Sequence, residues 1–180
     1  MNCRRLGLSL SLVLVSTTLA TSNPQSARSQ KFEAQKSFQL LKTLAGSWKG
    51  QGPEGPVRVS LRVTSGGSAL LQEMVPEGRA GDPTNGDDDP ITMFYLDGDR
   101  LILTMYCDSF KNRPRMAGKR SPDGKTVDFA FVDVSGGAKQ GYMDHATFTI
   151  SDADHHAEDW GVLASGGKHL SAHMNLVRVR

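Results

Sequence analysis

Cysteine is scarce in this chain of 180 residues, which contains only Cys3 and Cys107. Cys3 lies in a segment that we expect to be removed, so Cys107 has no partner within the mature chain and the fold cannot depend on a disulfide. Long apolar runs are also missing, because no segment reaches the roughly 20 apolar residues that a membrane-spanning helix needs. We therefore expect one domain that is stabilised by its core and is not inserted in a membrane.

The charge is nearly balanced, with 21 lysines and arginines against 19 aspartates and glutamates. Residues 1–20 hold two of the arginines and no acidic residue, so the rest of the chain carries equal numbers of both signs. A nucleic-acid groove or a polybasic membrane patch needs clustered positive charge. This composition therefore predicts no nucleic-acid partner.

Residues 1–20 have the pattern of a secretory signal peptide. Two arginines precede an apolar run over Leu6–Val15, and Thr18-Leu19-Ala20 supplies the small residues of a cleavage site. We expect export to the periplasm or secretion, with a mature chain that starts near Thr21. The paired arginines leave the export route open.

The mature chain is expected to begin with a flexible tether over residues 21–30, rich in Ser, Gln, Asn and Ala, followed by a single domain over residues 31–180. Four apolar residues then recur at intervals that indicate a short amphipathic helix ending at Gly46: Phe32, Phe38, Leu41 and Leu44. Such a helix could close one end of a barrel.

Alternating polar and apolar residues dominate the rest of the chain. The clearest case is Val57–Thr64, where every second residue is apolar, and Asp97-Gly98-Asp99 is a strong signal for a hairpin turn. About ten such segments follow one another with short turns: 46–50, 57–64, 68–75, 91–96, 100–107, 114–120, 125–134, 142–150, 154–163 and 168–179. We therefore predict an all-β fold, a single antiparallel up-and-down β-barrel with the helix at one end.

Several motifs carry a family resemblance. Gly46-Ser47-Trp48 resembles the Gly-x-Trp start of lipocalin-like (calycin) barrels, and Tyr95–Leu101, Thr104–Cys107 and Ser121–Lys125 resemble small exported bacterial proteins of uncharacterised function. The whole chain after the helix is similar to nitrobindin-like ten-stranded barrels. This resemblance implies a container for a small ligand.

Nitrobindin-like proteins further imply a ferric haem held by a histidine on the last strand, where His173 is the first candidate and His169 the second. The sequence departs from them after Gly50-Gln51-Gly52, because the further Gly-x-Tyr-Pro of such proteins is missing. On the last strand, His173 also alternates with the apolar face formed by Leu170, Ala172, Met174 and Leu176. If that face points inward, His173 faces water.

Candidate ligand contacts gather around one strand-loop-strand junction. A thioether, a phenol and a guanidinium there suit a ligand that is mostly apolar with a polar or anionic end. The predicted pocket residues are Met105, Tyr106, Cys107, Arg115, Met116 and His145. The alternative is that Met105 and Cys107 alternate into an ordinary core, and that His145 lies on the surface.

The densest group of potential metal ligands lies between Asp152 and Asp159. On a strand, Asp154, His156 and Glu158 share one side with Trp160, at spacings of about 6.6 Å that are wide for one small ion. We interpret this side as an outward polar face and expect no metal site. The acidic segment 82–89 lacks the ligand spacing of a calcium loop, and no serine stands in a nucleophile elbow.

Three hypotheses remain open. The first is a monomeric, exported barrel that binds a small apolar molecule without transforming it and needs no cofactor. The second is a haem barrel with redox or nitrogen-oxide chemistry through His173. The third is a filled barrel that binds another protein through its long Pro76–Pro90 loop.

Overall fold

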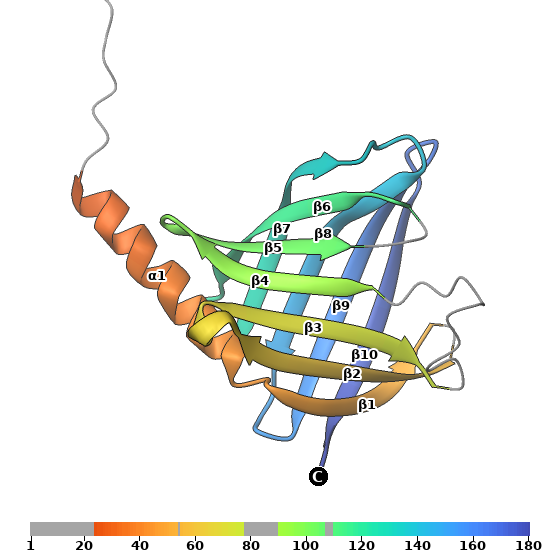
Figure 1. Cartoon of the computed structure of the whole chain (residues 1–180), viewed down its shortest axis with the longest axis horizontal. Coiled ribbons are helices and arrows are strands. Elements are labelled where there is room, and N and C mark those ends of the chain that lie inside the picture. Colours follow the sequence, from red (N-terminus) through yellow and green to blue (C-terminus); the bar gives the residue numbers. More distant parts are fainter. Residues whose placement is uncertain (1–23, 54, 78–89, 107–109) are drawn as a thin grey trace, which may run out of the picture.

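The protein folds as a closed antiparallel barrel in the computed structural model, which describes residues 24–53, 55–77, 90–106 and 110–180 (Figure 1). Each strand pairs with its neighbour in sequence, and the first pairs with the last, in the order β1-β10-β9-β8-β7-β6-β5-β4-β3-β2. This confirms the predicted fold class. The strands are β1 (Gly46–Gly52), β2 (Gly55–Thr64), β3 (Ala69–Pro76), β4 (Ile91–Asp97), β5 (Arg100–Tyr106), β6 (Arg113–Arg120), β7 (Thr126–Ser135), β8 (Gly141–Ile150), β9 (His155–Ala164) and β10 (His169–Val179).

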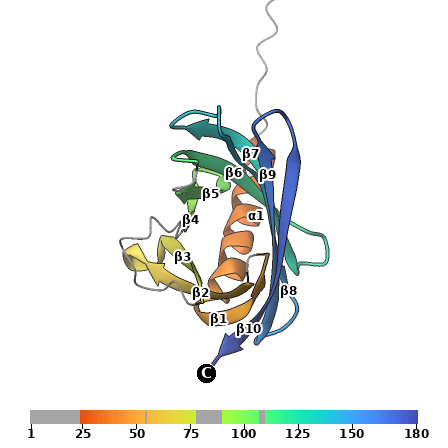
Figure 2. The ribbon, with the colours of Figure 1, turned by 90° about the vertical axis from the view of Figure 1, so that its right-hand side faces the viewer.

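The helix α1 (Pro24–Lys42) covers one end of the barrel, as the sequence predicted. Its C-terminal half buries Phe38 and Leu41 against the core. Figure 2 looks toward the opposite end, which we call the mouth, and shows α1 behind the ring of strands. Within the described residues, neither α1 nor any other helix has the length and apolarity that crossing a membrane would need.

The helix begins earlier than its apolar pattern indicates. Residues 24–30, expected to belong to a flexible tether, form the first turns of α1 and project beyond the barrel (Figure 1). Pro24 suits this start because proline is favoured in the first helical turn. The described side chains of these turns are exposed, so they lack the apolar periodicity on which the prediction depended.

The Gly46-Ser47-Trp48 motif fixes the start of β1. The Trp48 side chain is fully buried, and its Nε1 donates a hydrogen bond of 2.7 Å to the carbonyl of Leu44. Gly46 has φ of +140°, and a Cβ there would lie 2.4 Å from Nη1 of Arg178. The motif therefore needs glycine for its backbone and tryptophan for the contact between helix and barrel.

Arg178 ties this junction to the last strand, and its loss should be costly. Its guanidinium donates to the carbonyls of Ala45 at 2.8 Å, Thr43 at 3.0 Å and Ala153 at 2.7 Å. We expect Arg178→Leu to lower the free energy of unfolding by about 2 kcal/mol, because charged hydrogen bonds contribute more than neutral ones. Urea denaturation measures the loss. Arg180→Leu, at a side chain 83% exposed, is the control and should change little.

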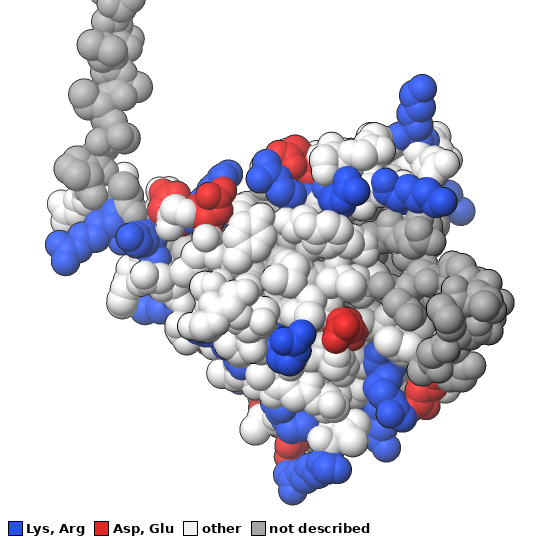
Figure 3. Space-filling model, in the orientation of Figure 1, with Lys and Arg blue, Asp and Glu red and all other residues white. Residues whose placement is uncertain are grey.

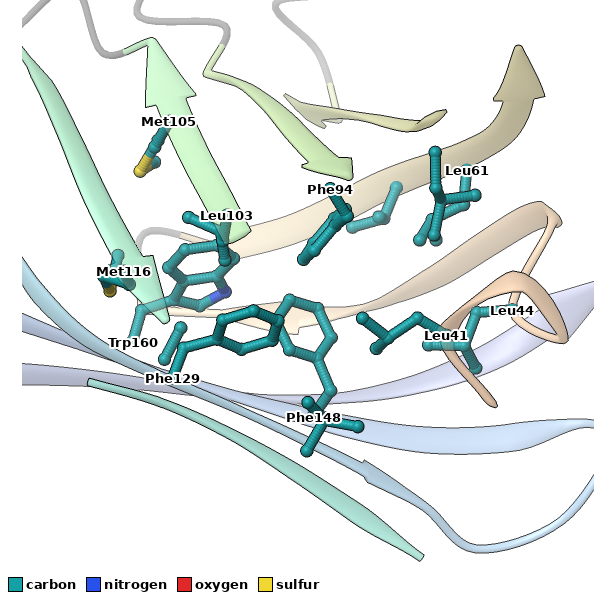
Figure 4. Packing of buried hydrophobic residues seen from close by; sticks show 14 of the residues in the cluster. Leu41, Leu44, Leu61, Phe94, Leu103, Met105, Met116, Phe129, Phe148 and Trp160 are labelled. Carbon is teal, nitrogen blue, oxygen red and sulfur yellow. The ribbon is translucent and has the colours of Figure 1, made fainter. Parts of the chain in front are cut away.

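Aromatic rings fill the middle of the barrel (Figure 4). The ring of Phe148 lies 5.3 Å from that of Phe94, 5.9 Å from that of Phe129 and 5.6 Å from that of Trp160, centroid to centroid. All four side chains are buried. The centre of the barrel is therefore filled by side chains, and we expect space for a ligand toward its ends.

Charges are spread over the outside. On the face shown in Figure 3, a basic and an acidic group lie side by side in a largely uncharged surface, and further basic groups lie above and below it. Several charged residues of the outer surface form exposed ion pairs, such as Arg58 with Glu77 and Arg100 with Asp97. Such pairs contribute little to stability.

Candidate functional site

The six predicted pocket residues do not meet in one place. Met105 and Met116 lie in the core, whereas Tyr106, with 47% of its surface exposed, follows Met105 on the outward side of β5. Arg115 alternates with Met116 on β6 and forms an ion pair with Asp133 on the outer face. Side chains of neighbouring strand residues point to opposite faces, which separates these pairs.

The remaining two predicted pocket residues are His145 and Cys107. His145 faces outward on β8, where its Nε2 lies 3.0 Å from Oγ1 of Thr147 and 3.1 Å from a carboxylate oxygen of Asp128. This agrees with the surface position that we weighed against the pocket. Cys107 lies outside the described residues, as do segment 82–89 and the predicted signal peptide.

The two histidines proposed for haem also lie on the outer face. Nδ1 of His173 is 2.6 Å from a carboxylate oxygen of Asp159, and Nδ1 of His169 is 3.3 Å from one of Asp144. Both imidazole side chains are more than half exposed. The middle of the barrel is occupied by aromatic rings, so these residues do not fit a haem held inside it.

The contact with Asp159 raises the pKa of His173 above its usual value, because the charged imidazole is stabilised by the hydrogen bond to the carboxylate. The stabilisation is present below the unfolded pKa of about 6.5 and is lost as the pH rises through the higher folded value. We therefore expect His173→Gln to lower the melting temperature at about pH 5.5 and to leave it nearly unchanged at about pH 9. His169→Gln is the control, and an equal effect of both variants would contradict the assignment.

A pocket of about 210 Å³ opens at the mouth of the barrel, between β1, β2, β3 and β10. Its walls are apolar or lack side chains. The lining residues are Gly52, Pro53, Gly55, Val57, Met74, Pro76, Pro90 and Met174. Gly52 leaves room in this wall, because a Cβ there would meet only ordinary contacts, 3.5 Å from the carbonyl oxygen of Gly55 and 3.8 Å from both Sδ of Met174 and Cβ of Val57.

A buried polar network lies beside this pocket. Glu158 on β9 is fully buried, and its carboxylate accepts hydrogen bonds from Nε2 of Gln72 at 2.8 and 2.9 Å, from Nε2 of His156 at 3.0 Å and from Nε1 of Trp160 at 3.0 Å. Gln72 belongs to β3, so its bond to Glu158 spans the barrel interior. We call these four residues the Glu158 network.

The position of the Glu158 network corrects the interpretation of residues 154–159. His156 and Glu158 share one side of β9 with Trp160, as predicted, but that side faces the interior and not the solvent. The prediction that these residues share one side of the strand was right, and the prediction that this side faces the solvent was wrong. Among the described residues, no three His, Cys, Asp or Glu side chains converge as metal ligands.

A second, larger depression of about 830 Å³ follows α1 outside the barrel. Phe32, Phe38 and Leu96 supply apolar surface, and three basic side chains border it. These cations already have partners, since Lys36 and Arg120 contact Glu33 and Lys42 donates to the carbonyl of Gly67. The mouth pocket is the better enclosed of the two.

Comparisons with known proteins support the fold. The chain is similar to the crystal structure of Rv2717c from M. tuberculosis, with a TM-score of 0.58 and 19% identity over 80% of this chain and 98% of that one. It is also similar to a DUF3598-family protein of unknown function from Nostoc punctiforme, with a TM-score of 0.40 and 13% identity over 77% of this chain and 48% of that one. No protein family model and no curated protein matches the chain. At this identity, the likeness to Rv2717c shows the barrel fold alone.

Proposed function

We propose that this protein is an exported, non-catalytic barrel of the lipocalin-like kind, which binds one small, mostly apolar molecule in the mouth pocket. The observation that carries the proposal is the apolar pocket of about 210 Å³ between β1, β2, β3 and β10. Apolar cavities of about 150 Å³ are large enough to hold benzene. The mouth pocket therefore suits a single ring or a chain of a few carbon atoms.

The lining is adaptable. Met74 and Met174 provide flexible, polarisable thioethers on facing walls, and methionine fits irregular apolar ligands well. Five of the seven methionines belong to the core or pack against it: Met74, Met105, Met116, Met143 and Met174. Such a lining favours binding by shape and apolar contact.

The groups around the mouth pocket indicate which kind of polar end its ligand has. No lysine or arginine lines the mouth pocket within the described residues, so the anionic end that we considered from the sequence has no counterpart there. The adjoining network contains the carboxylate of Glu158 and neither a lysine nor an arginine. The polar end is thus better matched by a hydrogen-bond donor than by an anion.

A side chain added at Gly52 should block binding without unfolding the barrel. Leucine at this position would extend toward Val57 and Met174 and fill the pocket, since the backbone there is open to any residue. With methyl-labelled methionine, addition of 1-hexanol to the unmodified protein is expected to shift the Met74 and Met174 signals in NMR spectra until saturation. In Gly52→Leu, these shifts should disappear.

Two controls accompany this experiment. Gln51→Leu adds the same side chain one residue away, on the exposed side of β1, and should leave binding intact. The Met93 signal should not move, because Met93 alternates with the buried Thr92 and Phe94 and therefore faces outward on β4. Absence of saturable shifts at Met74 and Met174 in the unmodified protein would overturn the proposed function.

A further inference from the structure

We propose that the Glu158 network selects the ligand of the mouth pocket by its head group, and that this head group is a primary amine or a similar cationic donor. The inference rests on the proposed function and adds a substrate class to it. It follows from three observations: the balance of hydrogen-bond donors and acceptors in the network, its two unpartnered atoms, and its position relative to the pocket.

The network has more acceptors than donors. Its donors are the amide group of Gln72, one ring N–H of His156 and the indole N–H of Trp160, and all of them are directed at the carboxylate. A carboxylate offers about four acceptor sites, and these four hydrogen bonds fill them. The oxygen of Gln72 and, in the neutral imidazole, the second ring nitrogen of His156 are further acceptors without a donor. The group that would complete this network is therefore a donor.

Two buried acceptor atoms of the network lack a hydrogen-bond donor. Oε1 of Gln72 and Nδ1 of His156 are buried and have no hydrogen-bond partner among the residues that the structure describes. Turning the glutamine amide over would not help, because its oxygen would then face the carboxylate of Glu158. Unpartnered polar atoms in a core cost free energy and are rare in folded proteins. Both belong to side chains that are no more than 2% exposed.

The network adjoins the pocket through two methionines. Met74 is the next inward residue after Gln72 on β3, toward the mouth, and Met174 lies directly opposite Glu158 in the pairing of β9 with β10. Both line the pocket. A methionine side chain has three rotatable bonds and can move aside at small cost. A donor head group entering between Met74 and Met174 would approach the negative charge of Glu158 and could pair with the two unpartnered atoms, Oε1 of Gln72 and Nδ1 of His156.

The test compares three probes of equal chain length with the unmodified protein: 1-aminohexane, 1-hexanol and hexanoate at pH 7. The amine is expected to bind about tenfold more tightly than the alcohol, with hexanoate the weakest, because the negative charge of Glu158 attracts an ammonium group and repels a carboxylate, and charge-assisted hydrogen bonds are stronger than neutral ones. Equal affinity for amine and alcohol, or a preference for hexanoate, would overturn the inference while leaving the mouth pocket in place. If none of the probes binds, the proposed function itself fails.

A variant provides a second readout. Glu158→Gln keeps the volume and removes the charge, so it should abolish the preference for the amine and retain the affinity for 1-hexanol within about twofold. Met174→Leu is the matched control, since it changes the wall of the pocket without changing charge and should affect both probes alike. A Glu158→Gln protein that folds and keeps the preference for the amine would assign the carboxylate a structural role only. Because the comparison of probes uses the unmodified protein, it decides the question even if this variant does not fold.

Discussion

Glu158→Ala is expected to lower the free energy of unfolding by about 3–5 kcal/mol, one of the two largest effects among the single changes considered. The substitution leaves the donors of Gln72, His156 and Trp160 buried without an acceptor. Each buried polar group that loses its partner costs about 1–3 kcal/mol. Guanidinium chloride denaturation, followed by tryptophan fluorescence and by circular dichroism, measures the change.

The control for this prediction lies on the outside of the same barrel. Glu73 neighbours Gln72 on β3 and is exposed, and it accepts a long hydrogen bond of 3.4 Å from Ser60. Glu73→Ala should therefore change the free energy of unfolding by less than about 0.5 kcal/mol. A loss at Glu158 as small as that at Glu73 would show that the network contributes nothing to stability.

Phe148→Ala should destabilise the protein by a similar amount, about 3–5 kcal/mol, for a different reason. Its ring contacts the rings of Phe94, Phe129 and Trp160 at the centre of the barrel. Removing it deletes buried apolar surface and leaves a cavity that the sheet can collapse into only in part. The same denaturation experiment gives the value.

Phe148→Leu separates the two contributions to that loss. Leucine restores much of the volume of the phenylalanine ring. Because cavity size governs the loss, Phe148→Leu should lower the free energy of unfolding by much less than Phe148→Ala does. Phe131→Ala is the exposed comparison, at a ring with 38% of its surface accessible, and should cost less than Phe148→Ala. Equal losses at Phe131 and Phe148 would contradict the central position of the Phe148 ring.

Strands and turns could be predicted from the sequence because their signals are local. In β2, Val57, Val59 and Leu61 are buried and alternate with more exposed residues, as period-two polarity indicated. The hairpin between β4 and β5 turns at Gly98, whose φ of +65° is the conformation for which glycine is favoured. Neither feature depends on distant parts of the chain.

The site could not be predicted in the same way, because it depends on which face of each strand meets the core. For β9, His156 and Glu158 suggested a solvent-exposed face, yet Gln72, which donates to Glu158, lies 86 residues away from it in sequence. The one local signal that this side faces inward was Trp160, because a large aromatic side chain on the same side favours burial. On β5 and β6, Tyr106 and Arg115 were grouped with Met105 and Met116 by proximity in sequence, although strand parity divides them between the two faces.

β-Bulges also limit how well alternation in the sequence predicts which side chains face inward. The pairing of β6 with β7 shifts at Val132 of β7, which is skipped between the partners of Arg115 and Met116, and the pairing of β8 with β9 shifts at Asp144 of β8. Each shift inserts an extra residue and changes which side chains face inward beyond it. Alternation counted through residues 142–150 therefore does not give the direction of His145.

The pairing of β1 with β10 constrains how the molecule can fold. Ser47 lies opposite Val179, so the seam that completes the ring joins segments from the two ends of the described chain. Such distant contacts form slowly, since a long loop of chain must be ordered before they contribute. During synthesis, the hydrogen-bonding edge of β1 must wait for the last strand to leave the ribosome. Until then it can pair with other chains, so this edge is where aggregation of the nascent protein would begin.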